Sequence, residues 1–392
     1  MQKKEFLRKL QQKRFIIATH VYGTGASQDL VRYLTDHKAK AVLFIGHPLF
    51  YDPNLSGSSY TFYVKGKKIY SHEDQNHRIP LFIGYFLHMM KSFIWVLKHP
   101  GVWDVYVGSN NLNAFVGICL KRFGKIKQVV YYVIDYNPVR YSNPIVNKLY
   151  HWLDQFCVLR ADATWNLSPR MEEGRKKYFS FSGGNQKTVP VGLWLKDIKK
   201  RGTRSYEPHT LVFLGHVQKK QGIQHIIEAI PMIIKKIPDF RFAVIGGGKY
   251  LEELQKQVKL LHIEKYVTFA GYISDHRKIE DTLSKCAAGI ALYDMKDGNN
   301  VSFSYFGNPT KIKTYLSAGL PILLSDVPYN AREIEKEGCG KIISYDPKEI
   351  ASVIIHVFSN PSVLMRYRTN IIHYRKRFDW NTIFEYQLQN LI

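Results

Sequence analysis

Cysteine and acidic residues are scarce in this sequence, and each shortage limits the classes of protein to which it could belong. The cysteines are few, far apart and without a CxxC pair, so neither a zinc site nor a disulfide framework is expected; they are Cys119, Cys157, Cys286 and Cys339. Only 32 Asp and Glu oppose 56 Lys and Arg, which gives a net charge of +24. A chain this basic implies an anionic partner: nucleic acid, an anionic membrane surface or a phosphorylated substrate.

Long apolar runs are also lacking. The most apolar stretch, 81–97, contains His88 and Lys91 and falls short of the about 20 residues that a bilayer span needs. It predicts an amphipathic or buried helix, with a helix lying in the membrane interface as the alternative. The first residues are polar and charged, with no signal-peptide core, so we expect a cytoplasmic protein, compatible with peripheral binding at the inner membrane face.

The composition is that of a folded protein, with 45% hydrophobic and 22% charged residues. The length of 392 residues favours two domains. In the first half, strand-like apolar runs alternate with helical patterns, and Thr61–Tyr70 reads as a hairpin with its tip at 65–67. The strand-like runs are 15–19, 41–45, 105–107, 128–134 and 162–167.

The second half alternates in the same way. Its strand-like runs are 211–214, 240–245, 267–270, 289–293, 322–325 and 341–344. The pattern predicts an α/β protein of two doubly wound domains, whose ligands bind beyond the carboxyl ends of parallel strands. The basic segment 195–209 is the expected linker, so the predicted domains are 1–200 and 201–360, with helices of 361–392 returning to the first.

Two glycine-containing junctions follow buried strands of the second half. In Leu211–Ile230 a strand ends at Gly215, and a loop with Lys219 and Lys220 leads into a helix, which suits an anion such as a diphosphate. An ordinary strand–loop–helix with solvated lysines is the alternative. In 243–254 three glycines, Gly246 to Gly248, permit either a tight turn or close approach of the backbone to a ligand.

A third motif, Gly307–Asp326, places Pro309 directly before a helix and Gly319 at its end. Thr310 and Lys311 then fall in the first turn, where backbone N–H groups are unpaired. This arrangement predicts an anionic ligand over the start of the helix.

Together, the segments GHVQKKQG, IGGG, VTFAGYI and NPTKIKTYLSAGLPI resemble the donor-binding domain of GT-B glycosyltransferases, in particular the retaining enzymes of family 4. The resemblance is specific over 211–345. It extends more loosely to YGTGASQDLVRYL near the N-terminus, which is similar to the glycine loop of the family and contains Gly23 and Gly25.

The resemblance implies two Rossmann-like domains that face each other across a cleft, and transfer of a sugar from a UDP- or GDP-sugar to a glycan or lipid-linked acceptor with retention. No metal or other cofactor is expected, because the donor phosphate helps to deprotonate the acceptor. The implied donor-binding residues are Gly23, Gly25, His216, Lys219, Lys220, Gln221, Gly246, Gly248, Tyr272, Ile273, Tyr293, Asn308, Pro309, Thr310, Lys311 and Thr314.

Four positions depart from the family pattern. His216 and Gln221 replace an Arg and a Lys, and Phe306 and Thr314 replace a pair of glutamates, of which the second usually holds the ribose. Lys219, Lys220 and Lys311 would then supply the positive charge. A weakened enzyme or non-catalytic scaffold, or an epimerase or phosphorylase on the same fold, therefore remain as alternatives. A nucleic-acid partner is not expected, since no binding motif for one is present.

Polar residues of the first half complete the expected site. Asp135 follows the strand-like run 128–134, and the resemblance makes it the candidate catalytic residue; a turn-capping role is the alternative. Arg140 is the candidate contact to an acceptor phosphate. His20, at the end of the first strand, is assigned to the acceptor side, with a contact to the donor phosphate or a plain loop histidine as the alternatives.

Overall fold

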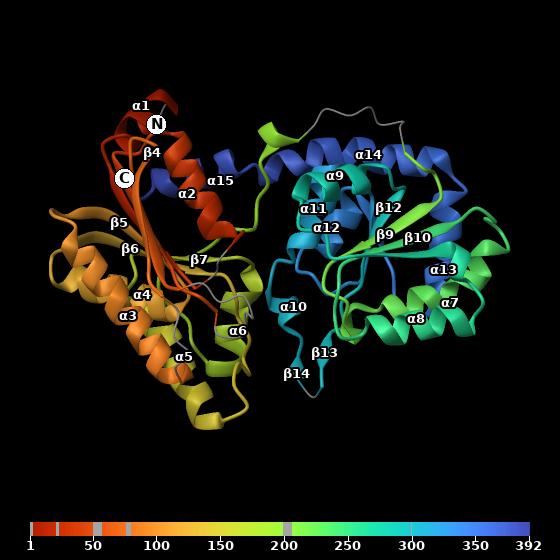
Figure 1. The fold of residues 1–392 in the computed structure, drawn as a ribbon, viewed down its shortest axis with the longest axis horizontal. Coiled ribbons are helices and arrows are strands. Elements are labelled where there is room, and N and C mark those ends of the chain that lie inside the picture. The colour runs from red at the N-terminus through yellow and green to blue at the C-terminus, as the bar shows by residue number, and fades with distance from the viewer. Residues whose placement is uncertain (1–2, 21–22, 50–56, 76–79, 199–205, 299) are drawn as a thin grey trace. The chain divides into compact units, whose positions relative to one another are not determined.

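The structure is a computed structural model that describes residues 3–20, 23–49, 57–75, 80–198, 206–298 and 300–392 (Figure 1). The chain forms two compact units, residues 1–190 with 380–392, and residues 191–379. The predicted boundary at residue 200 lies outside the described residues. The return to the first unit begins at Trp380 rather than at 361, because Leu364 and Ile371 are buried in cores of the second unit.

The first unit is built on an eight-stranded sheet of order β4-β3-β2-β1-β5-β6-β7-β8. The strands β2, β1, β5, β6, β7 and β8 pair in this order and are all parallel. Strands β3 and β4 form the predicted hairpin, which turns at Lys65 and Gly66 and pairs antiparallel with β2. The strands are β1 (Arg14–Thr19), β2 (Ala41–Gly46), β3 (Ser59–Val64), β4 (Lys67–Glu73), β5 (Trp103–Ser109), β6 (Ile126–Val133), β7 (Ala163–Asn166) and β8 (Gln186–Thr188).

The helices of the first unit are α1 (Lys3–Leu10), α2 (Ala26–Asp36), α3 (Leu81–Lys98), α4 (Asn111–Arg122), α5 (Pro144–Arg160), α6 (Pro169–Phe179) and α15 (Trp380–Gln389). Helix α4 packs on β5 and β6 and has α3 and α5 as neighbours (Figure 1). Helix α5 begins at Pro144 because the Asn143 side chain accepts hydrogen bonds from the N–H groups of Ile145 and Val146. None of the helices in the described ranges combines the length and apolarity that crossing a bilayer requires.

The second unit has a six-stranded parallel sheet of order β11-β10-β9-β12-β15-β16, with a separate short hairpin. Its strands are β9 (Thr210–Leu214), β10 (Arg241–Ile245), β11 (Val267–Gly271), β12 (Ala288–Ala291), β15 (Ile322–Leu324) and β16 (Gly340–Ile342), and the hairpin is β13 (Lys296–Asp297) with β14 (Asn300–Val301). Register places Val212 of β9 beside Ala243 and Gly289.

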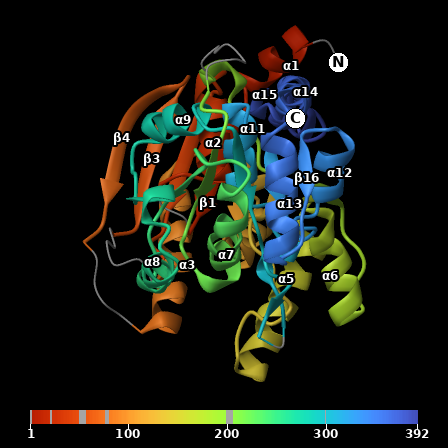
Figure 2. The same cartoon turned by 90° about the vertical axis from the view of Figure 1, so that its right-hand side faces the viewer.

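Two cores cover the faces of this sheet. Leu211 and Phe213 belong to one core and Val212 to the other, as strand alternation requires. Helices α7 (Ile223–Ile234), α8 (Leu251–Leu260) and α13 (Pro347–Phe358) serve the first core, and Figure 2 shows α7 beside α13. The remaining helices are α9 (His276–Ser284), α10 (Phe303–Phe306), α11 (Thr310–Ala318), α12 (Ala331–Lys336) and α14 (Pro361–Tyr374), with 3-10 turns at η1 (Leu195–Asp197), η2 (Lys219–Gln221), η3 (Glu264–Tyr266) and η4 (Arg375–Phe378).

Candidate functional site

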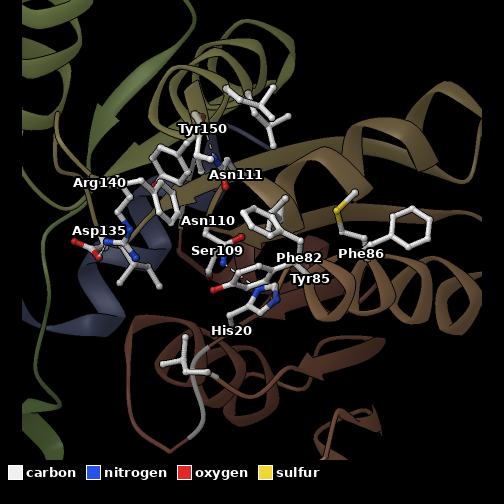
Figure 3. Close-up of a pocket in the computed structure, with 18 of the residues that line it drawn as sticks. His20, Phe82, Tyr85, Phe86, Ser109, Asn110, Asn111, Asp135, Arg140 and Tyr150 are labelled. Atoms are coloured by element: carbon white, nitrogen blue, oxygen red, sulfur yellow. Dashed lines mark hydrogen bonds and ion pairs between the residues drawn. The ribbon is translucent and has the colours of Figure 1, made fainter. Parts of the chain in front are cut away.

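A cavity of about 350 Å³ opens in the first unit at the carboxyl ends of three neighbouring parallel strands. Thr19 ends β1, Ser109 ends β5, and Asp135 follows β6. The sequence-predicted residues His20, Asp135 and Arg140 all line this cavity (Figure 3). Ligands in doubly wound sheets bind at this edge, so the cavity is the candidate site of the first unit.

His20 is buried and held by three side chains. Its Nδ1 lies 3.0 Å from the amide nitrogens of both Asn110 and Asn113, and its Nε2 lies 3.2 Å from Nδ1 of His88. Because amide nitrogens donate, Nδ1 is the accepting atom, and Nε2–H donates to His88. Burial, with a smaller contribution from His88, lowers the pKa of His20 to about 3, so the ring is neutral.

Asn110 combines an unusual backbone with two side-chain hydrogen bonds. Its φ of +75° lies in the left-handed region, which is uncommon outside glycine. Its Oδ1 accepts from the N–H of Asn113 at 3.1 Å and caps α4, while its amide donates to His20. Such conformations persist where the surroundings enforce them, and they concentrate at functional sites. Neither Asn110 nor His88 was among the residues predicted from the sequence.

Asp135 and Arg140 form an ion pair, and both residues line the cavity. The loop that carries them is held by Asn147, whose Oδ1 accepts from the N–H groups of Arg140 and Tyr141 at 2.8 and 3.1 Å. The Asn147 amide donates in turn to the carbonyl of Pro138 at 2.9 Å. The carboxylate of Asp135 remains about half exposed and therefore accessible to a ligand.

The second unit has a cavity of about 470 Å³ beyond β9, β10 and β11. It brings together four of the predicted residues, His216, Gly246, Tyr272 and Ile273, with further lining from Leu214, Gly215, Ile245, Gly247 and Ile279. The walls are apolar except for His216 and backbone groups, and the Tyr272 ring is 81% exposed. An exposed aromatic ring beside an apolar cavity suits stacking of a planar group.

Lys311 lies next to this cavity, in the first turn of α11. A Cβ on Gly215, which lines the cavity, would stand 3.3 Å from Cε of Lys311. The Nζ atom donates to Oε1 of Gln221 at 2.5 Å and lies 4.1 Å from the centre of the Phe213 ring and 5.0 Å from that of Tyr293. Burial lowers the pKa of Lys311 to about 7. A bound anion beside Nζ would raise this pKa again and keep the lysine protonated and positively charged.

The glycines of this unit serve close backbone packing. At Gly246, with a φ of +139°, an added Cβ would lie 1.9 Å from the carbonyl oxygen of Gly215. At Gly248 it would lie 2.2 Å from the carbonyl oxygen of Val217. Both glycines therefore let the loop after β10 lie against the loop after β9, and Gly246 also lines the cavity.

Six other predicted donor residues, on the loop after β9 and around the start of α11, are not among the residues that line this cavity. Lys219 is exposed, whereas Nζ of Lys220 lies 5.0 Å from the centre of the Phe303 ring. Pro309 caps α11 and is followed by the exposed Thr310, and the Asn308 amide donates to the hydroxyl of Tyr329 at 3.5 Å. The Thr314 hydroxyl donates to the carbonyl of Thr310 in its own helix at 3.2 Å, so it does not stand in for the family glutamate in this conformation.

Gly23 and Gly25 lie in the first unit, between β1 and α2. Gly23 has a φ of +94° and open space where a Cβ would be, and Gly25 is the N-cap of α2. They are not among the residues that line either cavity. For metals, no group of three or more His, Cys, Asp or Glu side chains within the described ranges is arranged to hold an ion.

Known proteins place the second unit in a family. Residues 208–360 match the family model of glycosyl transferases group 1. These residues form a group 1 glycosyltransferase domain. Curated relatives of this glycosyltransferase domain include the poly(glycerol-phosphate) alpha-glucosyltransferase of Bacillus subtilis, 21% identical over 41% of the chain, and the phosphatidyl-myo-inositol mannosyltransferase of Mycobacterium tuberculosis, 22% identical over 44%. The matches span 22% and 44% of the two relatives' own lengths.

Solved structures extend the similarity to the whole chain. The sucrose-phosphate synthase of Thermosynechococcus elongatus has a TM-score of 0.70 at 15% identity and covers 97% of this chain and 98% of its own. HepE of Anabaena in complex with UDP has a TM-score of 0.66 at 14% identity, covering 97% and 99%. The fold of both units together is therefore GT-B, with the glycosyltransferase domain as its second half.

Proposed function

We propose that the protein transfers a sugar from a nucleotide-sugar donor, a UDP- or GDP-sugar, to a hydroxyl of a glycan or lipid-linked acceptor. The observation that carries the proposal is the cavity of the glycosyltransferase domain lying beside the half-buried Lys311. Tyr272 and Ile273 would line the site of the base, and Lys311 with the N-terminus of α11 would meet the diphosphate.

We place the acceptor in the cavity of the first unit. Asp135 would orient the attacking hydroxyl or a sugar hydroxyl, and Arg140 and His20 would contact the rest of the acceptor. In a retaining transfer, the bond from the anomeric carbon to the diphosphate breaks as the acceptor oxygen bonds on the same face. The proton of the hydroxyl passes to the departing diphosphate, whose charge Lys311 and the helix N-terminus stabilise.

A lipid-linked acceptor would require work at a membrane, and the basic composition suits peripheral binding to anionic lipid at an inner membrane face. Co-sedimentation with vesicles tests this part separately. Binding to vesicles with anionic lipid, and not to vesicles of neutral lipid alone, is the expected outcome.

The central experiment is a donor screen read by nucleotide release, together with melting curves in UDP and GDP. A nucleoside diphosphate that binds the native state raises the melting temperature. We expect a shift with one of the two, weakened about 10- to 100-fold in apparent affinity by Lys311→Met, since a charge-assisted contact is lost. The matched control is Lys256→Met on the exposed face of α8, which should leave binding unchanged.

The outcomes separate the alternatives. Absence of any shift at millimolar UDP or GDP would refute donor binding. Binding without sugar release to any acceptor would indicate a non-catalytic scaffold. Conversion of the donor without an acceptor would indicate an epimerase or a phosphorylase.

A further inference from the structure

The cavity of the first unit has a polar end and apolar walls. The polar end lies at the strand ends, with Thr19, Ser109 and Asp135. The walls come from two helices, with Phe82, Phe86 and Met89 on α3 and Val146, Leu149 and Leu153 on α5. Figure 3 shows Phe82 and Phe86 on α3. Phe82, Phe86 and Leu149 are 68%, 60% and 62% exposed, so a large part of their apolar surface is accessible to a ligand.

The polar end is suited to hydroxyl groups. Asp135 presents a half-exposed carboxylate and Arg140 guanidinium N–H groups, and Asn110 and His20 form the base. A sugar would satisfy these groups. It would leave the apolar walls uncovered. Covering them would add affinity, because burial of apolar ligand surface against apolar walls is favourable.

The apolar surface continues outward along both helices. On α3 the exposed residues are Ile83, Leu87, Met90, Ile94 and Leu97, and on α5 they are Ile145, Leu149, Trp152 and Leu159, with the half-buried Phe156 between the last two. Both sets are spaced by alternating steps of four and three residues along the helix. Each set therefore forms one apolar stripe, and large exposed apolar patches mark interaction sites.

The charged residues of α3, α4 and α5 are basic with one exception. The sequences of α3, α4 and α5 contain Lys91, Lys98, Lys121, Arg122, Lys148 and Arg160. Their one acidic residue, Asp154, is buried and bonded to Arg175 at 2.7 Å. An anionic lipid surface would meet no repelling carboxylate on these helices.

From these observations we infer that the acceptor is an amphiphile whose apolar chain lies between α3 and α5, with its hydroxyl-bearing head at Asp135 and Arg140. The inference rests on the proposed function, of which it names the acceptor class. The apolar stripes place the mouth of the cavity against lipid, so the chain passes from the lipid phase into the cavity without exposure to water.

The test measures binding of a series of n-alkyl glucosides, from methyl to octyl, by calorimetry below their micelle concentrations. Methyl glucoside presents the head alone. Affinity should rise about fourfold for each added methylene, ~0.8 kcal/mol, until the cavity is filled. An affinity that does not change with chain length would overturn the inference.

Two matched variants show where the chain lies. Leu149 and Leu159 are both exposed residues of the α5 stripe, but only Leu149 lines the cavity. Leu149→Asn should weaken octyl glucoside binding about 10-fold or more, as loss of a leucine that the alkyl chain covers predicts, whereas Leu159→Asn should leave it unchanged. Equal weakening by both variants would place the chain on the outer stripe and overturn the cavity assignment.

Binding of UDP and GDP is measured on the same preparations. If nucleotide binds and the alkyl series does not, the acceptor class is wrong while the proposed function stands. If the alkyl series binds and no nucleotide does, the proposed transfer fails although the amphiphile site is real.

Discussion

Binding of a nucleoside diphosphate is expected to take up a proton, because the pKa of the half-buried Lys311 is lowered in the free protein. Burial lowers the pKa of Lys311 from 10.5 to about 7, so at pH 8 about one protein molecule in ten carries the charged lysine. A diphosphate in contact returns the pKa toward its ordinary value, since opposite charge favours the ammonium form. About 0.9 proton is then taken up per ligand at pH 8.

The same linkage sets the pH dependence of affinity. With the lysine pKa near 7 in the free protein and near 10.5 in the complex, affinity falls about 50-fold between pH 7 and pH 9, ~2.3 kcal/mol. Below pH 7 the lysine is charged in both states and its contribution becomes flat. The folding stability of the free protein changes in the opposite direction with pH. The unfolded chain keeps the Lys311 proton up to about pH 10.5, whereas the folded protein loses it near pH 7, so stability rises between these pH values.

Calorimetry at pH 8 in two buffers of different ionisation enthalpy measures the proton uptake directly. Lys311→Met should abolish both the uptake and the decline in affinity. It should also raise the free energy of unfolding near pH 7 by removing a partly desolvated charge. Lys256→Met, which changes an exposed lysine, should leave all three unchanged. Uptake near zero in the native protein, or uptake that persists in Lys311→Met, would refute the reasoning.

Three further predictions concern the first unit. Asp135→Asn should lower kcat about 100-fold or more with unchanged donor affinity, by steady-state kinetics and calorimetry; an unchanged kcat would remove Asp135 from the mechanism. Arg175→Met should cost about 3–5 kcal/mol in urea unfolding because it leaves Asp154 buried and unpaired, and adding Asp154→Leu should restore most of it; a cost below about 1 kcal/mol would contradict this. Burial lowers the pKa of His20 to about 3 and of His88 to about 4, so the unfolded chain binds protons first and stability should fall as pH drops from 6.5 toward 4; His88→Gln should flatten this slope, and an unaltered slope would speak against it.

The alternation of elements was predictable because buried parallel strands read as apolar runs. The runs 128–134 and 211–214 correspond to β6 and β9, and Gly66 marked the hairpin turn. Helix α13 was missed although Asp346 and Pro347 give it a clear start, with the Asp346 carboxylate accepting from the N–H of Lys348. The hairpin of β13 and β14 was missed because two-residue strands carry no periodicity.

The site was predictable only in part. Residues that follow neighbouring parallel strands meet at one edge, which is why His20 and Asp135 share a cavity. The contact of His20 with His88 joins positions far apart in sequence, and nothing in the spacing indicates it. The orientation of the Thr314 hydroxyl toward its own helix is likewise a matter of rotamer, which the sequence does not determine.

The position of α15 has a consequence for biosynthesis. Trp380 and Phe384 are buried, and their rings stack at 4.5 Å, with Phe384 5.5 Å from Tyr33 of α2. Since residues 380–392 follow 191–379 on the ribosome, the second unit emerges complete before the first unit receives its closing helix. Expression of the first unit by itself should therefore succeed only when 380–392 is joined to 1–190, whereas 191–379 is contiguous and needs no such splice.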